Sequence, residues 1–483
     1  MIRLLARVHR WLGVPMALLV FVWFVSGIVM ALGGGFPEVT ERDRLERGGP
    51  LPSLPEATAA EAFPAGVEAT GSVRIVPRLG KPIWEIESAR GIVQYDVASG
   101  VRLLPGTLSD TEARALARQW LGTEPETAVT VHAPDTWTPR AEAQGWLPML
   151  RATAHDGAEV YVSLAKGRIV QHSTSRARVM AWFGAIPHWI YFVQVRRHAV
   201  FWKWLVIALS TLGACAAFSG IAVGIARAFR HWARHGQFGP FRKTAFAWHH
   251  GAGLTVGALV FTWLVSGALS LDPFALDAHG TVRAEERERA RGGRFEPRAF
   301  TRSVRQAADA CAPHLVVRSL ELVQIVGEPF YVCRESPVRA MVLSASHEDA
   351  PLARLPAPWL DREVSALTGG EPSRVTELEA PDAYYYPTHF YPDMTFPVLK
   401  IESGAVVHYV DETTGRILRR HDGTSRTYRW LYHGFHSFDL PSLLAHPRIW
   451  YALILVLSLV GALVAATATW LAMARVRRFT SRR

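Results

Sequence analysis

The sequence predicts a membrane protein: a four-helix transmembrane bundle built from a two-fold internal repeat, with two large α+β domains on one side of the bilayer. Three observations lead to this fold class. Hydrophobic residues make up 49% of the 483-residue chain, which also holds 17 Trp and has a sequence pI near 9.8. Four stretches are long and apolar, and the first recurs as a near copy deep inside the chain. This composition is ordinary for a membrane protein with folded extramembrane parts and unusual for a soluble enzyme.

Each apolar stretch is long enough to cross a hydrocarbon core, which takes about 20 helical residues at a rise of about 1.5 Å each. The first follows a basic start, as a signal peptide would, but its apolar run exceeds the roughly 7 to 15 residues of a signal sequence. Together with its near copy, this length indicates spans in both places. The four predicted spans are residues 13–32, 204–226, 251–271 and 450–473.

Positive charge predicts the orientation of these spans. The short segments at one set of span ends hold thirteen Lys and Arg and no Asp or Glu, whereas the rest of the chain has 40 positive and 42 negative residues. By the positive-inside rule, that side is the cytoplasm, so the chain is a multi-pass protein of a bacterial inner membrane with both termini cytoplasmic. The charges lie beside span ends and no recognition motif accompanies them, so nucleic acid is excluded as a partner.

The predicted domain order follows from the spans. It is span one (1–33), a first periplasmic domain (34–187), an outer segment with span two (188–228), a cytoplasmic loop (229–248), span three (249–272), a second periplasmic domain (273–435), and an outer segment with span four and a basic tail (436–483).

Alternating apolar and polar runs predict strands in both outer domains, each of which holds two strand-turn-strand half-units. In the first domain the runs are PIWEIES, IVQYDVASG and EVYVSLAKGRIVQ, with a helix at EARALARQWLG. In the second they are FYVCRES, VLKIESG and VVHYVDETTGRIL, with a helix at SVRQAADACAP. Cys311 and Cys333 lie in the second domain and are candidates for a disulfide, which the sequence alone leaves open.

An internal duplication relates the two halves of the chain. FVWFVSG at 21–27 matches FTWLVSG at 261–267, an offset of 240 residues, and the even-numbered spans match at an offset of 248. Repeats that have otherwise diverged keep histidine in equivalent positions, which we interpret as functional. The three pairs are His9 with His249, His188 with His436, and His198 with His446.

A lone histidine at a span end is most often an interfacial or helix-capping residue, but paired helices can direct two imidazoles at one point. Two facing imidazoles suit six-coordinate haem iron, whereas zinc usually takes four ligands. The pairs form two tiers, one at each membrane face, as an electron path across the bilayer requires. The pairing remains open, since His9 could bind iron opposite a residue of span two.

Glycines on the same helical faces fit this hypothesis. Gly13 and Gly27 share a face with His9, and Gly253 and Gly267 share a face with His249, because 4 and 18 residues are close to one and five turns. Small residues there leave room for a porphyrin. Close helix packing is the alternative explanation, and the sequence does not decide between the two.

Several longer motifs resemble those of the PepSY-associated transmembrane family, which includes inner-membrane reductases linked to ferric siderophore uptake. The motifs are HRWLG at 9–13, PHWIYF at 187–192, YYYPTHFYPDMTFPVLKI at 384–401, YVDETTGRI at 409–417 and RWLYHGFHSFDLP at 429–441. The resemblance implies four spans, PepSY-like periplasmic domains and haem b, two per chain, held by membrane histidines. It favours His9, His249, His188 and His436 as iron ligands, with His198 and His446 as alternative outer ligands.

The substrate site is predicted near the aromatic run that precedes the last repeat unit. Tyr384, Tyr385, Tyr386 and His389 could form a wall that receives a ferric chelate, and His433 shares a helical face with His436. The alternative is that these tyrosines lie at the membrane interface, where Tyr is enriched.

The resulting hypothesis is a transmembrane haem-dependent ferric siderophore reductase. The cytoplasmic segments are too short for a flavin or nicotinamide domain, and no GxGxxG fingerprint is present, so a quinol or cytoplasmic reductant must supply electrons. One alternative is a membrane-anchored PepSY module that binds or inhibits a partner without redox activity. Transport is disfavoured because the spans carry no Asp, Glu or Arg at mid-depth.

Overall fold

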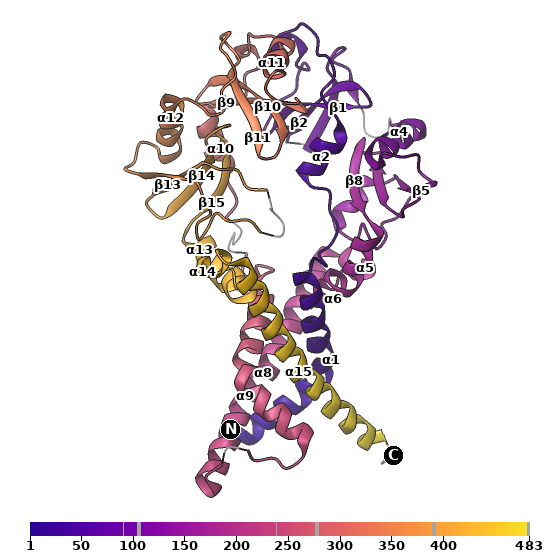
Figure 1. Cartoon of the computed structure of the whole chain (residues 1–483), viewed down its shortest axis with the longest axis vertical. Coiled ribbons are helices and arrows are strands. Elements are labelled where there is room, and N and C mark those ends of the chain that lie inside the picture. Colours follow the sequence, from indigo (N-terminus) through magenta and orange to yellow (C-terminus); the bar gives the residue numbers. More distant parts are fainter. Residues whose placement is uncertain (90, 104–107, 238, 276–279, 389–392, 481–483) are drawn as a thin grey trace.

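The computed structural model describes residues 1–483 except 90, 104–107, 238, 276–279, 389–392 and 481–483. The molecule is elongated, with a helical bundle at one end and β-sheets at the other (Figure 1). Within the described residues, four helices are long and apolar enough to cross a membrane: α1 (Ile2–Ala31), α8 (Ala199–His235), α9 (Thr244–Leu269) and α15 (Pro447–Thr480). They contain the four predicted spans, and the prediction of four apolar helices is confirmed.

The four helices surround one another in a ring. Helix α1 packs against α8 and α15, and α9 packs against the same two helices, so α1 and α9 lie diagonally across the bundle. Glycines permit this packing: Gly461 faces the ring of Phe24 with no room for a side chain, and a Cβ on Gly257 would lie 2.9 Å from Ile221. The helices overrun the predicted spans at the basic end, where α8 continues to His235 and shortens the predicted loop 229–248.

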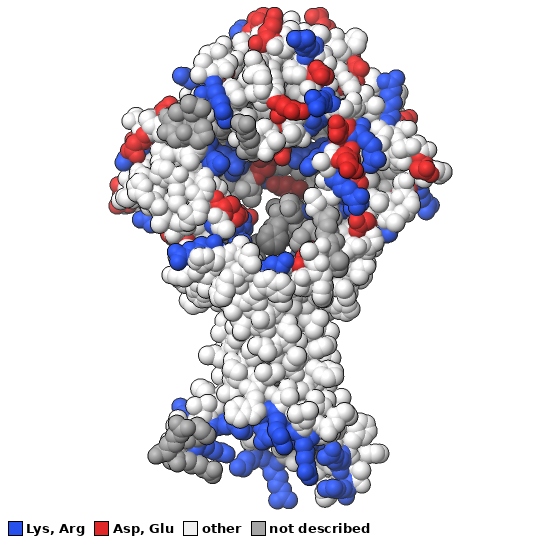
Figure 2. Space-filling view, turned by 180° about the vertical axis from the view of Figure 1, so that it is seen from behind, with Lys and Arg blue, Asp and Glu red and all other residues white. Residues whose placement is uncertain are grey.

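Charge divides the surface of the molecule into zones. Figure 2 shows an uncharged band around the bundle and basic residues at the end of the bundle away from the sheets. We call these the basic end and, next to the sheets, the domain end. An uncharged band of this kind is what a lipid bilayer requires, because a charged side chain in hydrocarbon is costly.

The largest sheet has seven strands in the order β11-β10-β9-β1-β2-β3-β4. Its central pair, β1 and β9, is antiparallel, with Arg74 opposite Glu321. The predicted separation into two outer domains therefore differs from the structure, since segments 34–187 and 273–435 share one sheet. The strands are β1 (Val73–Arg78), β2 (Lys81–Ser88), β3 (Gly91–Asp96), β4 (Arg102–Leu103), β9 (Ser319–Ile325), β10 (Glu328–Ser336) and β11 (Arg339–Ser344).

Two four-stranded antiparallel sheets lie on either side, between the large sheet and the bundle (Figure 1). Each is accompanied by one helix, α4 (Asp110–Leu121) or α12 (Ala357–Thr368). Helix α4 starts at a Ser109 capping box and ends at Gly122, whose φ of +73° suits glycine. The strands are β5 (Thr127–Val131), β6 (Met149–Thr153), β7 (Glu159–Ser163), β8 (Arg168–Ser173), β12 (Arg374–Leu378), β13 (Val398–Ser403), β14 (Val406–Asp411) and β15 (Ile417–His421).

Short helices join the sheets to the bundle or cover the sheets. They are α2 (Glu41–Gly48), α3 (Ala59–Ala62), α5 (Ser175–Phe183), α6 (Ala185–Trp189), α7 (Val193–Arg196), α10 (Ala284–Arg291), α11 (Val304–Cys311), α13 (Gly423–Arg429), the π-helix η3 (Trp430–Gly434) and α14 (Pro441–Leu444), with 3₁₀ turns η1 (Ala141–Trp146) and η2 (Pro297–Ala299).

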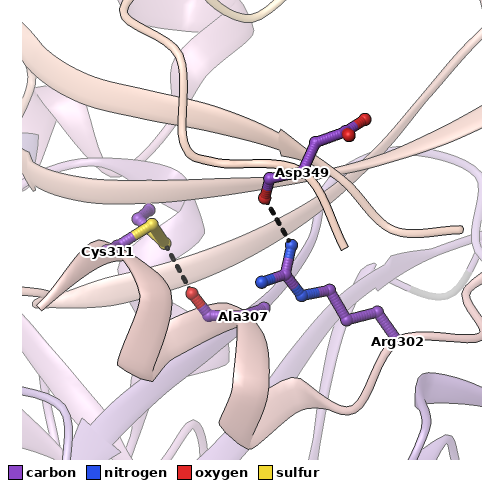
Figure 3. Close-up of a disulfide and its surroundings, with 5 residues drawn as sticks. Arg302, Ala307, Cys311 and Asp349 are labelled. Carbon is purple, nitrogen blue, oxygen red and sulfur yellow. Dashed lines mark hydrogen bonds between the residues drawn. A yellow bond between two sulfur atoms is a disulfide. The ribbon is translucent and has the colours of Figure 1, made fainter. Parts of the chain in front are cut away.

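The core of the large sheet combines both outer segments. Trp84, Phe300 and Tyr331 are buried together in one hydrophobic cluster. A disulfide between Cys311 of α11 and Cys333 of β10 holds a helix against this sheet (Figure 3). The disulfide that the sequence left open is therefore present.

Replacing Cys311 and Cys333 together by Ala should lower the free energy of unfolding by about 3 kcal/mol, because the bond closes a loop with a sequence separation of 22 residues. Thermal unfolding of the detergent-solubilised protein measures the effect as a midpoint several degrees lower. Cys215→Ala is the matched control, since this free cysteine is exposed on α8. A double variant with an unchanged midpoint would contradict a stabilising role for the disulfide.

Candidate cofactor site

Two of the predicted histidines face each other near the basic end of the bundle. His9 of α1 and His249 of α9 have ring centroids 6.1 Å apart, with an angle of 27° between the ring planes. Because α1 and α9 are diagonal neighbours, the two imidazoles meet across the bundle. Both bond to the helices between them: Nδ1 of His9 lies 2.9 Å from the carbonyl of Ala216, and His249 bonds the carbonyl of Val464.

A second pair lies at the domain end. His188 in α6 and His436, two residues after η3, have ring centroids 6.2 Å apart and ring planes at 65°. Nδ1 of His188 lies 3.1 Å from the carbonyl of Trp23, and His436 bonds the carbonyl of Trp263. Glycines allow this approach, because a Cβ on Gly27 would lie 3.4 Å from the His188 ring and one on Gly267 would lie 3.7 Å from that of His436.

Hydroxyl groups fix the tautomer of three of these histidines. Ser26 and Ser266 donate to the carbonyls of Trp23 and Trp263 at 3.1 and 3.0 Å, and each hydroxyl oxygen also lies within 3.1 Å of a histidine Nδ1. Thr467 does the same beside His249, at 2.8 Å to the carbonyl of Val464 and 3.3 Å to Nδ1. A hydroxyl has one hydrogen, so its oxygen must accept from Nδ1–H. The Nε2 atom then keeps its lone pair.

A lone pair on Nε2, with Nδ1–H held by a carbonyl, is the arrangement that metal-ligating histidines adopt. His9 fits it too, since only Nδ1–H can donate to the Ala216 carbonyl. Among the described residues, no hydrogen bond to Nε2 of any of these four histidines is present. The four imidazoles are therefore oriented as ligands by their protein partners.

The spacing of the rings tests whether one metal ion fits between each pair. A metal–nitrogen bond is about 2.0–2.1 Å and the nitrogen lies about 1.1 Å from the ring centre, so two opposed imidazoles place their centroids about 6.2–6.4 Å apart. The observed 6.1 and 6.2 Å are close to this spacing. Within the described part of the chain, no group of three or more His, Cys, Asp or Glu side chains could hold a metal, which argues against a tetrahedral zinc site.

Space around the basic-end pair suits a larger group than a bare ion. A Cβ built on Gly13 or Gly253, one turn from His9 and His249, would meet no atom within 4 Å. The two pairs are separated along α1 by the 17 residues from His9 to Ser26, about 25 Å at the helical rise. Apolar side chains that include Phe24, Val260 and Leu264 fill the bundle.

The other predicted ligands lie away from both pairs. His198 is exposed at the start of α8, and its Nε2 accepts a hydrogen bond from Arg197. His446 is exposed just before α15. The structure brings neither of them to another histidine in the described residues, so it gives no support to either as an outer ligand.

The predicted aromatic wall differs from the structure. Tyr385 and Tyr386 are buried, the first stacked on Tyr409 with centroids 5.2 Å apart and the second bonded through its hydroxyl to Asp439. They stabilise the β12–β15 sheet and its contact with η3, so they cannot form an open surface. Tyr384 accepts a hydrogen bond from Trp430 at its hydroxyl. His389 lies outside the described residues.

His433 lies close to the domain-end pair without joining it. Its Nδ1 is 3.6 Å from a carboxylate oxygen of Asp439, and its ring centroid lies 4.6 Å from that of Tyr432. Tyr432 in turn contacts His436, with centroids 5.4 Å apart. The arrangement fits the predicted position beside a ligand.

Sequence reasoning missed the groups that orient the histidines. Ser26 and Ser266 were visible in the repeated motif, but the carbonyls of Ala216, Val464, Trp23 and Trp263 carry no side-chain signature. Gly220 was also missed, although a Cβ there would lie 2.6 Å from the ring of His9. A glycine in an apolar helix opposite a histidine is the one signal that could have indicated this contact.

The family model described as the PepSY-associated TM region matches residues 6–353. No curated protein matches the chain. The matched region contains α1, α8 and α9, His9, His188 and His249, and most of the seven-stranded sheet. Because the match covers more than half of the residues, and agrees with the resemblance found in the sequence, this chain belongs to the PepSY-associated TM region family.

Proposed function

We propose that this protein is an inner-membrane haem b protein that moves electrons across the bilayer to reduce a periplasmic ferric substrate, a ferric siderophore, for iron uptake. One observation carries the proposal. Two imidazole pairs lie at opposite ends of the bundle, each with the spacing that one metal requires. An anchor without redox activity has no need for either pair.

Four histidines would hold the two haems: His9 with His249, and His188 with His436. Haem supplies reversible one-electron chemistry when bound. The chain supplies the rest: carbonyls of neighbouring helices hold each Nδ1–H, which keeps Nε2 directed at the centre of the pair. The apolar side chains of the bundle exclude water between the two tiers.

Charge and redox chemistry support the orientation. The basic end would be cytoplasmic by the positive-inside rule, and the sheets would then be periplasmic. The Cys311–Cys333 disulfide fits this placement, because disulfides persist in oxidising compartments. A quinol or cytoplasmic reductant would donate electrons at the His9 tier. The ferric substrate would approach the His436 tier through the hollow that Figure 2 shows between the sheets and the bundle.

The two-fold internal repeat belongs to the same proposal, with each half supplying one ligand to each tier and one PepSY-like domain. Hydrogen bonds that recur at an offset of 248 support it: Trp202 donates to the carbonyl of Trp189, and Trp450 donates to that of Ser437. The carbonyls that hold His9 and His249 follow the same offset. The β1–β9 register fits a pseudo-twofold axis through the Arg74–Glu321 pair.

A visible absorption spectrum of the purified protein, before and after dithionite, tests this function. We expect a Soret band, sharp reduced α and β bands, and about two haems per chain by pyridine-haem quantification, since two histidine pairs are present. Expression in cells supplied with haem is the necessary condition. Protein that carries no haem under that condition would favour the membrane-anchored PepSY binding module.

His9→Ala and His249→Ala should each remove the same spectral component, because both rings would bind one iron. Redox-titrated difference spectra of the single variants measure the loss, with about half of the haem remaining. His198→Ala is the control, since this exposed histidine contacts neither pair. Loss of different components in the two variants would contradict the pairing.

His436→Ala should leave the haem of the His9 tier reducible while lowering ferric-chelate reduction at least about 100-fold, as loss of an axial ligand at the exit tier predicts. Stopped-flow reoxidation of dithionite-reduced protein by a ferric siderophore measures this rate. His446→Ala is the matched control at the same end of the bundle. Ferric reduction at the wild-type rate in His436→Ala would move the exit site elsewhere.

A further inference from the structure

A pocket in the extramembrane part lies where α2, strands β1–β3, α4 and β8 meet. It encloses about 100 Å³ between the seven-stranded sheet and the β5–β8 sheet. Two carboxylates, Glu41 and Glu85, are among its lining residues. Six arginines from four separate parts of the chain also line it: Arg44, Arg47, Arg74, Arg78, Arg168 and Arg318.

Three of these arginines have a structural role that accounts for them. Arg44 donates to the carbonyl of Ile169, Arg47 to that of Trp120, and Arg318 to those of Leu45 and Glu46. These bonds fasten α2 between the two sheets. A fourth, Arg74, is paired with both carboxylates of the pocket, at 2.6 Å to Glu41 and 2.9 Å to Glu85.

Arg78 and Arg168 have no such explanation. Arg78 donates to the neutral amide oxygen of Gln94 at 3.2 Å, and the buried Nε of Arg168 has no hydrogen-bond partner. Glu85 feels the charge of Arg168, but its oxygens already accept from Arg74 and Gln94. Among the described residues, neither Arg78 nor Arg168 has a carboxylate within ion-pair distance.

The backbone brings these two guanidinium groups to one place. Arg78 ends β1, and Arg168 begins β8 directly after Gly167. Gly167 has a φ of +61°, and a Cβ on it would lie 3.0 Å from Nη1 of Arg78, so only glycine lets the turn approach this closely. Burial lowers the pKa of Arg78, and burial together with the charge of Arg168 lowers that of Arg44.

We propose that this pocket binds a small oxyanion with at least two negative charges, a phosphate or a compact carboxylate, through Arg78 and Arg168. Placing several guanidinium groups together out of water is costly unless an anion compensates them. Arginine also presents paired N–H groups that match phosphate and carboxylate oxygens. The volume holds such an anion and is too small for haem or a ferric siderophore. The inference is independent of the proposed redox function.

Equilibrium dialysis of the full-length protein in detergent against radiolabelled orthophosphate tests the proposal. We expect one saturable site per chain at low millimolar phosphate or below, where general salting-out effects of phosphate are small. Arg78→Gln and Arg168→Gln should each weaken binding about tenfold or more, since each removes charge-assisted hydrogen bonds. Arg168→Lys keeps the charge and should give an intermediate affinity.

The matched control is Arg294→Gln, which removes one arginine whose side chain is 80% exposed and does not line the pocket. It should bind phosphate like the wild-type protein. Competition by citrate distinguishes the two sources of anion: stronger displacement by citrate than by unlabelled phosphate identifies a carboxylate ligand, and the reverse identifies a phosphate. Wild-type protein without saturable binding, or an Arg78→Gln/Arg168→Gln double variant of unchanged affinity, would overturn the proposal.

Discussion

The candidate cofactor site depends on one interaction, the hydrogen bond from a histidine Nδ1–H to a backbone carbonyl of another helix. A buried imidazole needs a partner for its N–H, and in an apolar bundle the available acceptors are carbonyls. The carbonyls of Ala216 and Trp23 accept from His9 and His188, and those of Val464 and Trp263 accept from His249 and His436. Each bond joins two helices, so the positions of the imidazoles and the packing of the bundle are determined together.

The β1–β9 pair sets a comparable constraint in the extramembrane part. It joins the segment after α1 to the segment after α9, so the two halves of the bundle are tied together by one continuous sheet at the far end of the molecule. The small sheets then lie between this clamp and the helices (Figure 1). Without the β1–β9 pair, the two outer segments would be independent domains, as the sequence suggested, and nothing outside the membrane would fix α1 relative to α9.

The sequence predicted those features that have a local or repeated signal. Apolar length and flanking arginines predicted the four helices, and the repeated WxxSG motif aligned His9 with His249 across 240 residues. The β1–β9 pairing could not be predicted, because an edge strand with a local hairpin partner does not indicate its second neighbour. Arg44, Arg78, Arg168 and Arg318 are far apart in the chain, so their convergence on one pocket is visible only in the fold. The run at Tyr384–Tyr386 failed for another reason: buried core and interfacial tyrosines have the same composition.

The two halves differ most at the domain-end pair. Gly184 precedes α6, and a side chain there would collide with the carbonyl of Gly34, which accepts the N–H of Ala185. The position 248 residues later is Tyr432, whose ring contacts His436. His188 is thus held beside the backbone that links α1 to α2, whereas His436 lies beside an aromatic ring and close to the His433–Asp439 pair. Since the groups around a ligand tune the metal that it binds, two equivalent histidines in unequal surroundings give the tier nearest the sheets a polarity that the basic-end tier lacks.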